Sequence, residues 1–161
     1  MIAIVADSQR FTLDSNVLVY AVDGRAGLKH ETARQIVLAA ARLDCWLTFQ
    51  SVSEFYVAVT RKRIVPAAAA AERVVDWMTA FRCLAVSGRT IQAALPNAVA
   101  RRSSYWNALL VATAAEAGCN LVLTEDMADG TFLSGVQIHN PFVIGGMSDM
   151  TRQLLDLRSA R

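Results

Sequence analysis

Acidic side chains stand where this chain passes from a predicted strand to a predicted helix or loop. Asp14 follows the short apolar run at residues 11–13, and Glu54 and Asp126 follow two later runs of the same kind. Open α/β sheets bind their ligands at the carboxyl ends of strands, so a carboxylate there is a candidate for catalysis or metal binding. For Asp14 the plainer alternative is a helix cap or turn former, because aspartate is favoured at the start of a helix.

Asp7 is a rival to Asp14, because it also follows an apolar run. We prefer Asp14 because the polar pair Ser15 and Asn16 follows it, and either residue can cap the amphipathic run that comes next. Asp7 is followed by no such pattern. The sequence therefore favours Asp14 as the first acid of a site.

The apolar pattern predicts short strands at residues 11–13, 45–49, 83–86, 121–124 and 136–138. It predicts helices at residues 17–22, 30–43, 51–59, 66–81, 90–102 and 105–117. The strand at 121–124 shows no alternation of polar and apolar residues, as expected of a parallel strand buried on both faces. Alternating strands and helices predict an α/β fold, a three-layer sandwich with a central parallel sheet.

Local signals at the helix ends refine this pattern. Ser51 and Glu54 have the spacing of a capping box, which is the structural alternative for Glu54. Pro96 must kink or divide the helix predicted at residues 90–102, because proline lacks the backbone donor that a helix interior needs. Ser104 can cap the most apolar helix of the chain.

The composition is that of one folded domain. The chain has 161 residues, 54% of them hydrophobic, which is enough for a substantial core. The net charge of +2 is too small to indicate nucleic-acid binding, as the charge of a very basic domain would. Fourteen of the sixteen basic residues are arginine, which suits bidentate phosphate contacts but follows equally from a GC-rich genome.

Cysteine usage and hydropathy predict a protein of the cytoplasm. Cys45, Cys83 and Cys119 are odd in number and widely spaced, so we expect three buried thiols rather than disulfides or a thiolate metal site. The longest apolar helical run is too short to cross a bilayer, and residues 1–6 lack the features of a signal peptide. We therefore expect no membrane association.

Four motifs occur in a fixed order along the chain, and together they carry a family resemblance. They are Leu-Asp-Ser-Asn-Val-Leu-Val-Tyr at residues 13–20, Ser-Glu-Phe at 53–55, Tyr-Trp-Asn-Ala-Leu-Leu-Val-Ala at 105–112 and Leu-Thr-Glu-Asp-Met-Ala-Asp-Gly at 123–130. Over residues 11–142 the chain resembles a PIN domain, and more closely a VapC-type toxin of a type II toxin-antitoxin pair. We expect one domain at 1–161, with an N-terminal extension at 1–10 and a C-terminal tail at 147–161 that can form an amphipathic helix.

The resemblance implies a metal-dependent endoribonuclease toxin that hydrolyses RNA phosphodiester bonds. Asp14, Glu54 and Asp126 would be ligands of Mg²⁺ or Mn²⁺, with Asp129 a possible further ligand. These hard cations prefer carboxylate oxygens, and a close group of carboxylates repels itself unless a cation compensates it. The resemblance also implies a cognate antitoxin protein as a partner and a second copy of the chain in a homodimer. It implies no membrane partner.

The sequence departs from the family pattern at Asn107, where the pattern has aspartate. The asparagine side chain is nearly isosteric and its carbonyl can still coordinate, but the site loses one negative charge. The chain is therefore expected to be weakened or inactive. It is either a natural variant or the product of a deliberate replacement, and we favour the second because the surrounding motif is intact.

Two other interpretations stay open. A haloacid dehalogenase-type enzyme would use an aspartate after the first strand as a nucleophile. Such an enzyme also needs a lysine in its active site, and the chain has only Lys29 and Lys62. A PIN-like protein with a natural Asn107 would bind RNA or a partner without cutting. Arg101 and Arg102, just before the helix of Asn107, are candidate phosphate contacts or simply a solvated helix end.

Overall fold

The computed structural model describes residues 9–157. Its strands are β1 (Phe11–Leu13), β2 (Trp46–Thr48), β3 (Arg82–Leu84), β4 (Leu121–Leu123), β5 (Phe132–Leu133), β6 (Val136–His139), β7 (Phe142–Val143) and β8 (Gly146–Met147). Its α-helices are α1 (Ser15–Tyr20), α2 (Leu28–Ala40), α3 (Phe49–Arg61), α4 (Ala67–Ala80), α5 (Gly88–Val99), α6 (Tyr105–Glu116) and α7 (Asp149–Leu154), with a 3₁₀ turn at Gly24–Ala26. Strands and helices alternate over most of this length, as the sequence predicts.

The central sheet is mostly parallel. Its hydrogen-bonded order is β1-β4-β6-β5, in which β1, β4 and β6 are parallel and β5 runs antiparallel to β6. The parallel pair β2-β3 continues the sheet beyond β1 through one bridge between Phe11 and Cys45. The expected parallel sheet is confirmed, and the antiparallel β5, which the sequence pattern did not predict, makes it mixed.

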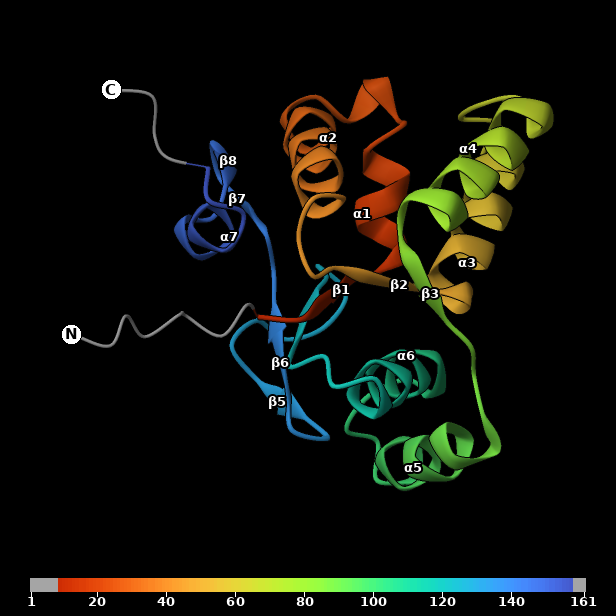
Figure 1. Cartoon of the computed structure of the whole chain (residues 1–161), viewed down its shortest axis with the longest axis vertical. Helices are drawn as coiled ribbons and strands as arrows, with labels where there is room; N and C mark the ends of the chain where they lie inside the picture. The colour runs from red at the N-terminus through yellow and green to blue at the C-terminus, as the bar shows by residue number, and fades with distance from the viewer. Residues whose placement is uncertain (1–8, 158–161) are drawn as a thin grey trace.

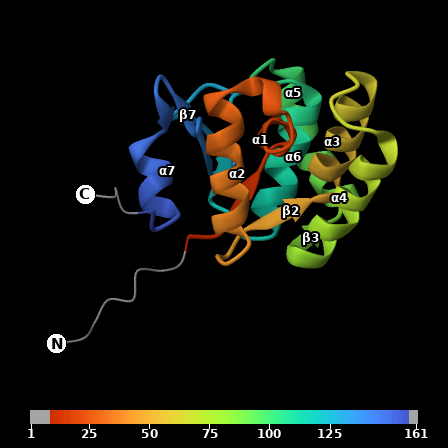
Figure 2. The same ribbon diagram turned by 90° about the horizontal axis from the view of Figure 1, so that it is seen from above.

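Helices cover both faces of the sheet, which gives the predicted three layers. Helices α1 to α4 lie on one side, and α5 and α6 lie on the other (Figure 1). Seen from above, α3 and α4 stand at one end of the molecule and α7 at the opposite end (Figure 2). The α/β sandwich expected from the alternation is therefore the observed architecture.

β4 is buried on both faces, as its continuous apolar pattern predicts. Leu121 and Leu123 belong to the core under α1 to α4, whereas Val122 belongs to the core under α6. Both cores are thus anchored on a strand of three residues. The residues that follow β4 leave the sheet next to the end of its parallel neighbour β1, which places Asp126 near Asp14.

Several helix ends differ from the predictions. Asp14 itself caps α1, in place of Ser15 or Asn16. Thr48 caps α3 by accepting a hydrogen bond from the Ser51 backbone, so the predicted capping box at Ser51 and Glu54 is wrong. In each case the capping residue stands at the carboxyl end of the strand, because the helix follows without a loop.

Pro96 lies inside one continuous α5, so the helix is not divided. Ser104 caps α6, as predicted, and Gly118 adopts a positive φ of 79° just beyond it.

The three cysteines are free thiols; Cys45 and Cys119 are buried, and Cys83 is half-buried rather than buried.

The segment after β6 packs against the core. Met147 and Leu155 are buried in the core under α1 to α4, and the expected C-terminal helix is present as α7. The predictions for residues 1–8 and 158–161 lie outside the described residues, and Asp7 is among them. In the described part of the chain, no helix has the length and apolar character needed to cross a membrane.

Candidate metal centre

Asp14 lies at the carboxyl end of β1 and is almost fully buried, with 4% of its surface exposed. Its Oδ1 accepts a hydrogen bond of 2.7 Å from the Ser15 backbone, which satisfies a donor in the first turn of α1. The structural and functional interpretations of Asp14 are therefore compatible, because one oxygen caps the helix while the other faces the neighbouring strand.

Thr124 joins the ends of β1 and β4. Its fully buried hydroxyl donates to Asp14 Oδ2 at 2.7 Å and accepts from the Asp126 backbone at 3.1 Å. The hydroxyl accepts a further hydrogen bond from Asn16 Nδ2 at 3.0 Å. The hydroxyl thus fixes the buried acid and the start of the β4–β5 loop to each other.

The Asn16 amide lies between two carboxylates. Its Nδ2 is 3.1 Å from Asp14 Oδ2 and 3.1 Å from Asp126 Oδ2. Two acids that approach one donor group from different strands repel each other unless a cation or a proton compensates them. Asn16 therefore brings the two carboxylates together and partly offsets their charge.

The electrostatic surroundings disfavour an ionised Asp14. Burial is the largest cause, and the charges of Asp126 and Glu54 add to it, so the pKa of Asp14 rises to about 6 from its ordinary value of 3.8. The hydrogen bonds from Thr124 and the Ser15 backbone act in the opposite direction. A buried acid with a raised pKa at a strand end is typical of functional sites.

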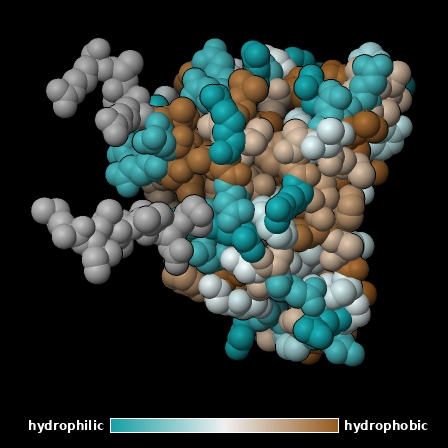
Figure 3. All heavy atoms as spheres, viewed as in Figure 1, coloured by the Kyte–Doolittle hydropathy of each residue, from teal (hydrophilic) through white to brown (hydrophobic). Residues whose placement is uncertain are grey.

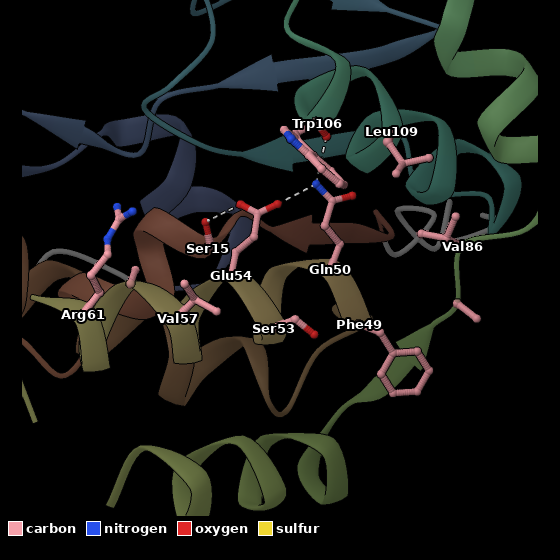
Figure 4. Close-up of a pocket in the computed structure, with 12 residues that line it drawn as sticks. Ser15, Phe49, Gln50, Ser53, Glu54, Val57, Arg61, Val86, Trp106 and Leu109 are labelled. Atoms are coloured by element: carbon pink, nitrogen blue, oxygen red, sulfur yellow. Dashed lines mark hydrogen bonds between the residues drawn. The ribbon is translucent and has the colours of Figure 1, made fainter. Parts of the chain in front are cut away.

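Glu54 reaches the same region from α3. Its Oε2 accepts from the Ser15 hydroxyl at 3.2 Å, and its Oε1 accepts from Gln50 Nε2 at 2.7 Å (Figure 4). The same Gln50 amide donates to the Trp106 carbonyl at 2.9 Å. These bonds connect α1, α3 and the first turn of α6 around the Glu54 carboxylate.

Asn107 follows Trp106 in that first turn and is half-buried. Its backbone donates to the capping hydroxyl of Ser104 at 3.2 Å. Its side-chain amide forms no hydrogen bond with any residue in the range 9–157. The structure therefore brings position 107 to the side of the molecule that holds Glu54, without engaging the asparagine side chain.

Asp129 takes part in a different network. Its Oδ1 lies 2.9 Å from His139 Nδ1 and accepts from the Asn140 backbone at 2.8 Å. The other ring nitrogen of His139 lies 2.7 Å from the hydroxyl of Ser148, the residue that caps α7. The structure thus ties Asp129 to the end of β6 and not to the hydrogen bonds around Asp14.

That network contains the residue types of a serine hydrolase triad, with Ser148, His139 and Asp129 joined in series. Ser148 is buried and accepts a hydrogen bond from the Thr151 backbone. We interpret the series as a structural connection between the acidic loop and α7.

The two arginines that are candidate phosphate contacts, Arg101 and Arg102, are exposed in the turn between α5 and α6.

Asn16, Thr124 and Gln50 also contact the acids, although their positions in the sequence did not mark them as parts of a site. The first two lie inside the motifs that surround Asp14 and Asp126, but motif position alone does not say that their side chains bridge the acids. Gln50 stands one turn before Glu54, a spacing that places both on one helix face. That spacing was the available signal for Gln50.

Glu125 lies between Thr124 and Asp126 in the chain, but its carboxylate bonds to other residues. Its carboxylate accepts from the Tyr20 hydroxyl and, at 2.6 Å, from Lys29 Nζ. This partnership raises the pKa of Lys29, with the hydrogen bond to Glu125 as the largest cause. The lysine compensates the Glu125 charge, so the site gains no further negative charge from the middle of the loop.

Two buried threonines allow the role of the Thr124 hydroxyl to be tested. We expect Thr124→Val to lower the free energy of unfolding by about 1–3 kcal/mol, because it removes the 2.7 Å hydrogen bond to the buried Asp14 Oδ2 and the acceptor of the Asp126 backbone N–H. Thr124→Ser should retain most of the stability. Urea denaturation at pH 7 measures both effects.

Thr12 is the matched control, because its hydroxyl is buried and has no hydrogen-bond partner among the described residues. Thr12→Val should leave stability unchanged or raise it by about 1 kcal/mol, since it removes an unsatisfied polar group. Equal losses for the Thr12 and Thr124 variants would contradict the assignment of the hydroxyl bonds.

The donor set fits a hard divalent cation, although it is not arranged as a complete coordination shell. Asp14, Asp126 and Glu54 offer carboxylate oxygens of the kind that Mg²⁺ and Mn²⁺ prefer. Among residues 9–157, no group of three or more His, Cys, Asp or Glu side chains is close enough to hold a metal ion. Amide and hydroxyl donors now occupy the oxygens that a cation would engage.

Comparison with known proteins agrees with this arrangement. The sequence profile of the PIN domain family matches residues 11–128, so the chain belongs to the PIN domain family. This match confirms the family resemblance drawn from the four motifs. No significant match to a curated protein was found.

Solved structures share the fold at low sequence identity. VapC20 of Mycobacterium tuberculosis, a toxin that cleaves the sarcin-ricin loop, is 17% identical with a TM-score of 0.59 over 77% of this chain and 97% of its own. A toxin-antitoxin complex from Klebsiella pneumoniae gives 17% identity and a TM-score of 0.60 over 81% and 97%. VapBC2 from Rickettsia felis, bound to a fragment of its promoter DNA, gives 11% and 0.59 over 82% and 98%.

Proposed function

We propose that this chain is a metal-dependent endoribonuclease toxin of a toxin-antitoxin pair, weakened by the asparagine at position 107. The observation that carries the proposal is the pairing of Asp14 and Asp126 through Asn16 and Thr124 at the carboxyl end of the sheet, in a PIN domain. The structural relative VapC20 cleaves RNA, and this supports RNA as the substrate.

Asp14, Glu54 and Asp126 would hold Mg²⁺ or Mn²⁺, with the Asn107 carbonyl as a weak fourth ligand. A bound divalent cation can activate water and stabilise charge on a phosphodiester. The chain's own polar groups orient the ligands: Thr124 holds Asp14, Asn16 holds Asp126, and Ser15 and Gln50 hold Glu54. Asp129 is a weaker candidate ligand because His139 and the Asn140 backbone share its Oδ1.

The proposed partners are an antitoxin protein and a second copy of the chain. The Klebsiella relative is a toxin-antitoxin complex, which supports the first. Hydrophobic residues run across the middle of the face shown in Figure 3, whereas hydrophilic residues dominate its lower end. Val75 and Met78 are both exposed and stand three residues apart on α4, which gives one apolar helix face of the kind that a protein partner covers.

RNA cleavage by the Asn107→Asp variant tests the proposal. Incubation with cellular RNA and Mg²⁺ or Mn²⁺ should give discrete fragments, and a chelator should stop their formation. The double variant with Asp14→Ala should give none. No cleavage by the restored variant, or cleavage that survives the loss of Asp14, would contradict the proposal.

A second candidate function is RNA or partner binding without cleavage. The observation in its favour is the unengaged amide of Asn107, which lowers the negative charge of the site. The codon for residue 107 in the source gene separates the candidates, together with a binding assay. An asparagine codon with RNA binding and no cleavage would favour the binding module.

A further inference from the structure

His139 ends β6 and is buried, with a partner at each of its ring nitrogens. Nδ1 lies 2.9 Å from Asp129 Oδ1, and Nε2 lies 2.7 Å from the hydroxyl of Ser148. An ionised carboxylate only accepts hydrogen bonds, so the ring donates from Nδ1 to Asp129. A buried polar group is costly to leave without a partner, and these two contacts therefore fix the orientation of the ring.

Asp129 attaches the loop between β4 and β5, residues 124–131, to the end of β6. Its side chain is 58% exposed, yet its Oδ1 accepts both from the buried ring and, at 2.8 Å, from the Asn140 backbone. Gly130 follows with a positive φ of 77° and donates from its backbone to the Ile138 carbonyl at 2.9 Å. The chain thus turns back toward β6 at this point, with the Asp129 carboxylate bonded to the residues that end the strand.

The same histidine also holds the other end of this loop. The Thr124 backbone donates to the His139 carbonyl at 2.9 Å, and the Thr124 hydroxyl accepts from the Asp126 backbone at 3.1 Å. His139 therefore contacts the loop on both sides of Asp126, through its backbone at Thr124 and through its ring at Asp129.

Asp126 itself has little else to hold its side chain. It is exposed, and within residues 9–157 its carboxylate forms one hydrogen bond, from Asn16 at 3.1 Å. The position of that carboxylate relative to Asp14 therefore depends on how the loop is held.

We propose that Asp129 and His139 are positioning residues of the metal centre, which keep Asp126 beside Asp14, and that Asp129 does not ligate the cation itself. The inference rests on the proposed function and gives one of its candidate ligands a different role. Two donors on Oδ1 direct the Asp129 carboxylate to β6, whereas Asp126 shares the Asn16 amide with Asp14. Groups that orient metal ligands change metal affinity by about 10–100-fold when they are replaced.

Two replacements of Asp129 separate a positioning role from ligation. Asparagine keeps an oxygen that can accept from His139 and from the Asn140 backbone but has no charge for a cation, whereas alanine loses both. In Mn²⁺ calorimetry we expect Asp129→Ala to weaken binding about tenfold. Asp129→Asn should recover most of that loss. Asp149→Asn is the matched control, because it removes an exposed carboxylate from the first turn of α7 and should change the affinity by less than about twofold.

Two replacements of His139 separate its bond to Asp129 from its bond to Ser148. The amide nitrogen of asparagine is as many bonds from Cβ as Nδ1 of histidine, and that of glutamine is as many as Nε2. His139→Asn can therefore keep the donor for Asp129, while His139→Gln can keep the contact with Ser148. We expect His139→Asn to bind Mn²⁺ within about threefold of the parent, and His139→Gln to lose about tenfold. Joining His139→Gln to Asp129→Ala should cost no more than either change alone, because both remove the same bond.

Hydrogen exchange reports on the loop without any metal. The Asp126 amide donates to Thr124, and the Asp14 amide donates to the Leu123 carbonyl at 3.0 Å, so the first reports on the loop and the second on the sheet. Asp129→Ala and His139→Gln should speed exchange at Asp126 about tenfold and leave Asp14 within about twofold of the parent. Equal acceleration at both amides would mean a general loss of stability and would contradict the positioning role.

Two affinity results would also overturn the inference. Binding by Asp129→Asn as weak as that of Asp129→Ala would make Asp129 a ligand, and equal affinities for His139→Asn and His139→Gln would exclude the bond to Asp129 as the cause. If every variant binds Mn²⁺ as the parent does, the inference fails and the proposed function stands. If neither the parent nor Asn107→Asp binds Mn²⁺, the proposed metal-dependent function fails, and exchange at Asp126 alone decides whether Asp129 and His139 hold the loop.

Discussion

Asn107→Asp is expected to tighten Mn²⁺ binding by at least tenfold. The replacement adds a carboxylate to a site that already has Asp14, Glu54 and Asp126 as candidate ligands, and the affinity of hard cations rises with the number of charged ligands. Two unit charges 4 Å apart attract by about 4 kcal/mol at an effective dielectric constant of 20, and only part of this is lost to repulsion among the acids. Isothermal titration calorimetry with Mn²⁺ measures the change.

Asn120→Asp is the matched control. Asn120 is exposed and immediately precedes β4, so an aspartate there adds the same charge at the opposite end of that strand from Asp126. It should change Mn²⁺ affinity by less than about twofold, because exposed charges at that separation are largely screened. Equal affinities for the parent and the Asn107 variant would show that position 107 is not a ligand.

Asp14→Asn is expected to raise the free energy of unfolding at pH 7 by about 2 kcal/mol in the absence of metal. The carboxyl has a pKa of about 6 when folded and 3.8 as its ordinary value, so folding favours the neutral form. The parent therefore loses stability as the pH rises from about 4 to about 6, and the loss is complete at pH 7. The pKa difference corresponds to about 3 kcal/mol. Asparagine has no charge to bury and keeps an oxygen for the Ser15 backbone, but its amide nitrogen cannot accept the hydrogen bond from Thr124, so we expect a gain of about 2 kcal/mol.

Urea denaturation in a chelating buffer at several pH values checks this expectation. The difference between parent and variant should be small near pH 4 and largest at pH 7. Asp76→Asn makes the same charge change at an exposed position of α4 and should move the stability by less than about 0.5 kcal/mol. A destabilised Asp14 variant at pH 7 would mean that the hydrogen bond from Thr124 outweighs the cost of burial.

The arrangement of the sheet was largely predictable, because it follows from short apolar runs separated by helices. β4 illustrates this well, since its lack of alternation corresponds directly to burial on both faces. β5 escaped prediction because its two residues, Phe132 and Leu133, pair only through tertiary context. Two helix caps, those of α1 and α3, were misassigned for a related reason: at Asp14 and Thr48 the helix follows the strand without a loop.

The positions of the candidate acids could be predicted from the sequence, but the side-chain contacts that hold them could not. Asp14, Glu54 and Asp126 follow strands, and parallel topology gathers such positions. The roles of Asn16 and Thr124 depend on side-chain contacts across more than a hundred residues of sequence, with a separation of 108 between these two. His139 lies outside the four motifs, and only the structure shows that it pairs with Asp129.

The pairing of β1 with β4 determines when the site can form during synthesis of the chain. Phe11 pairs with Leu121, so the first strand of the sheet waits for a neighbour made more than a hundred residues later. Long-range parallel pairing forms slowly, because the intervening chain must be closed into a loop first. A growing chain on the ribosome therefore carries Asp14 and Glu54 but no assembled centre, and the proposed metal site forms only after the chain has been made past Asp126.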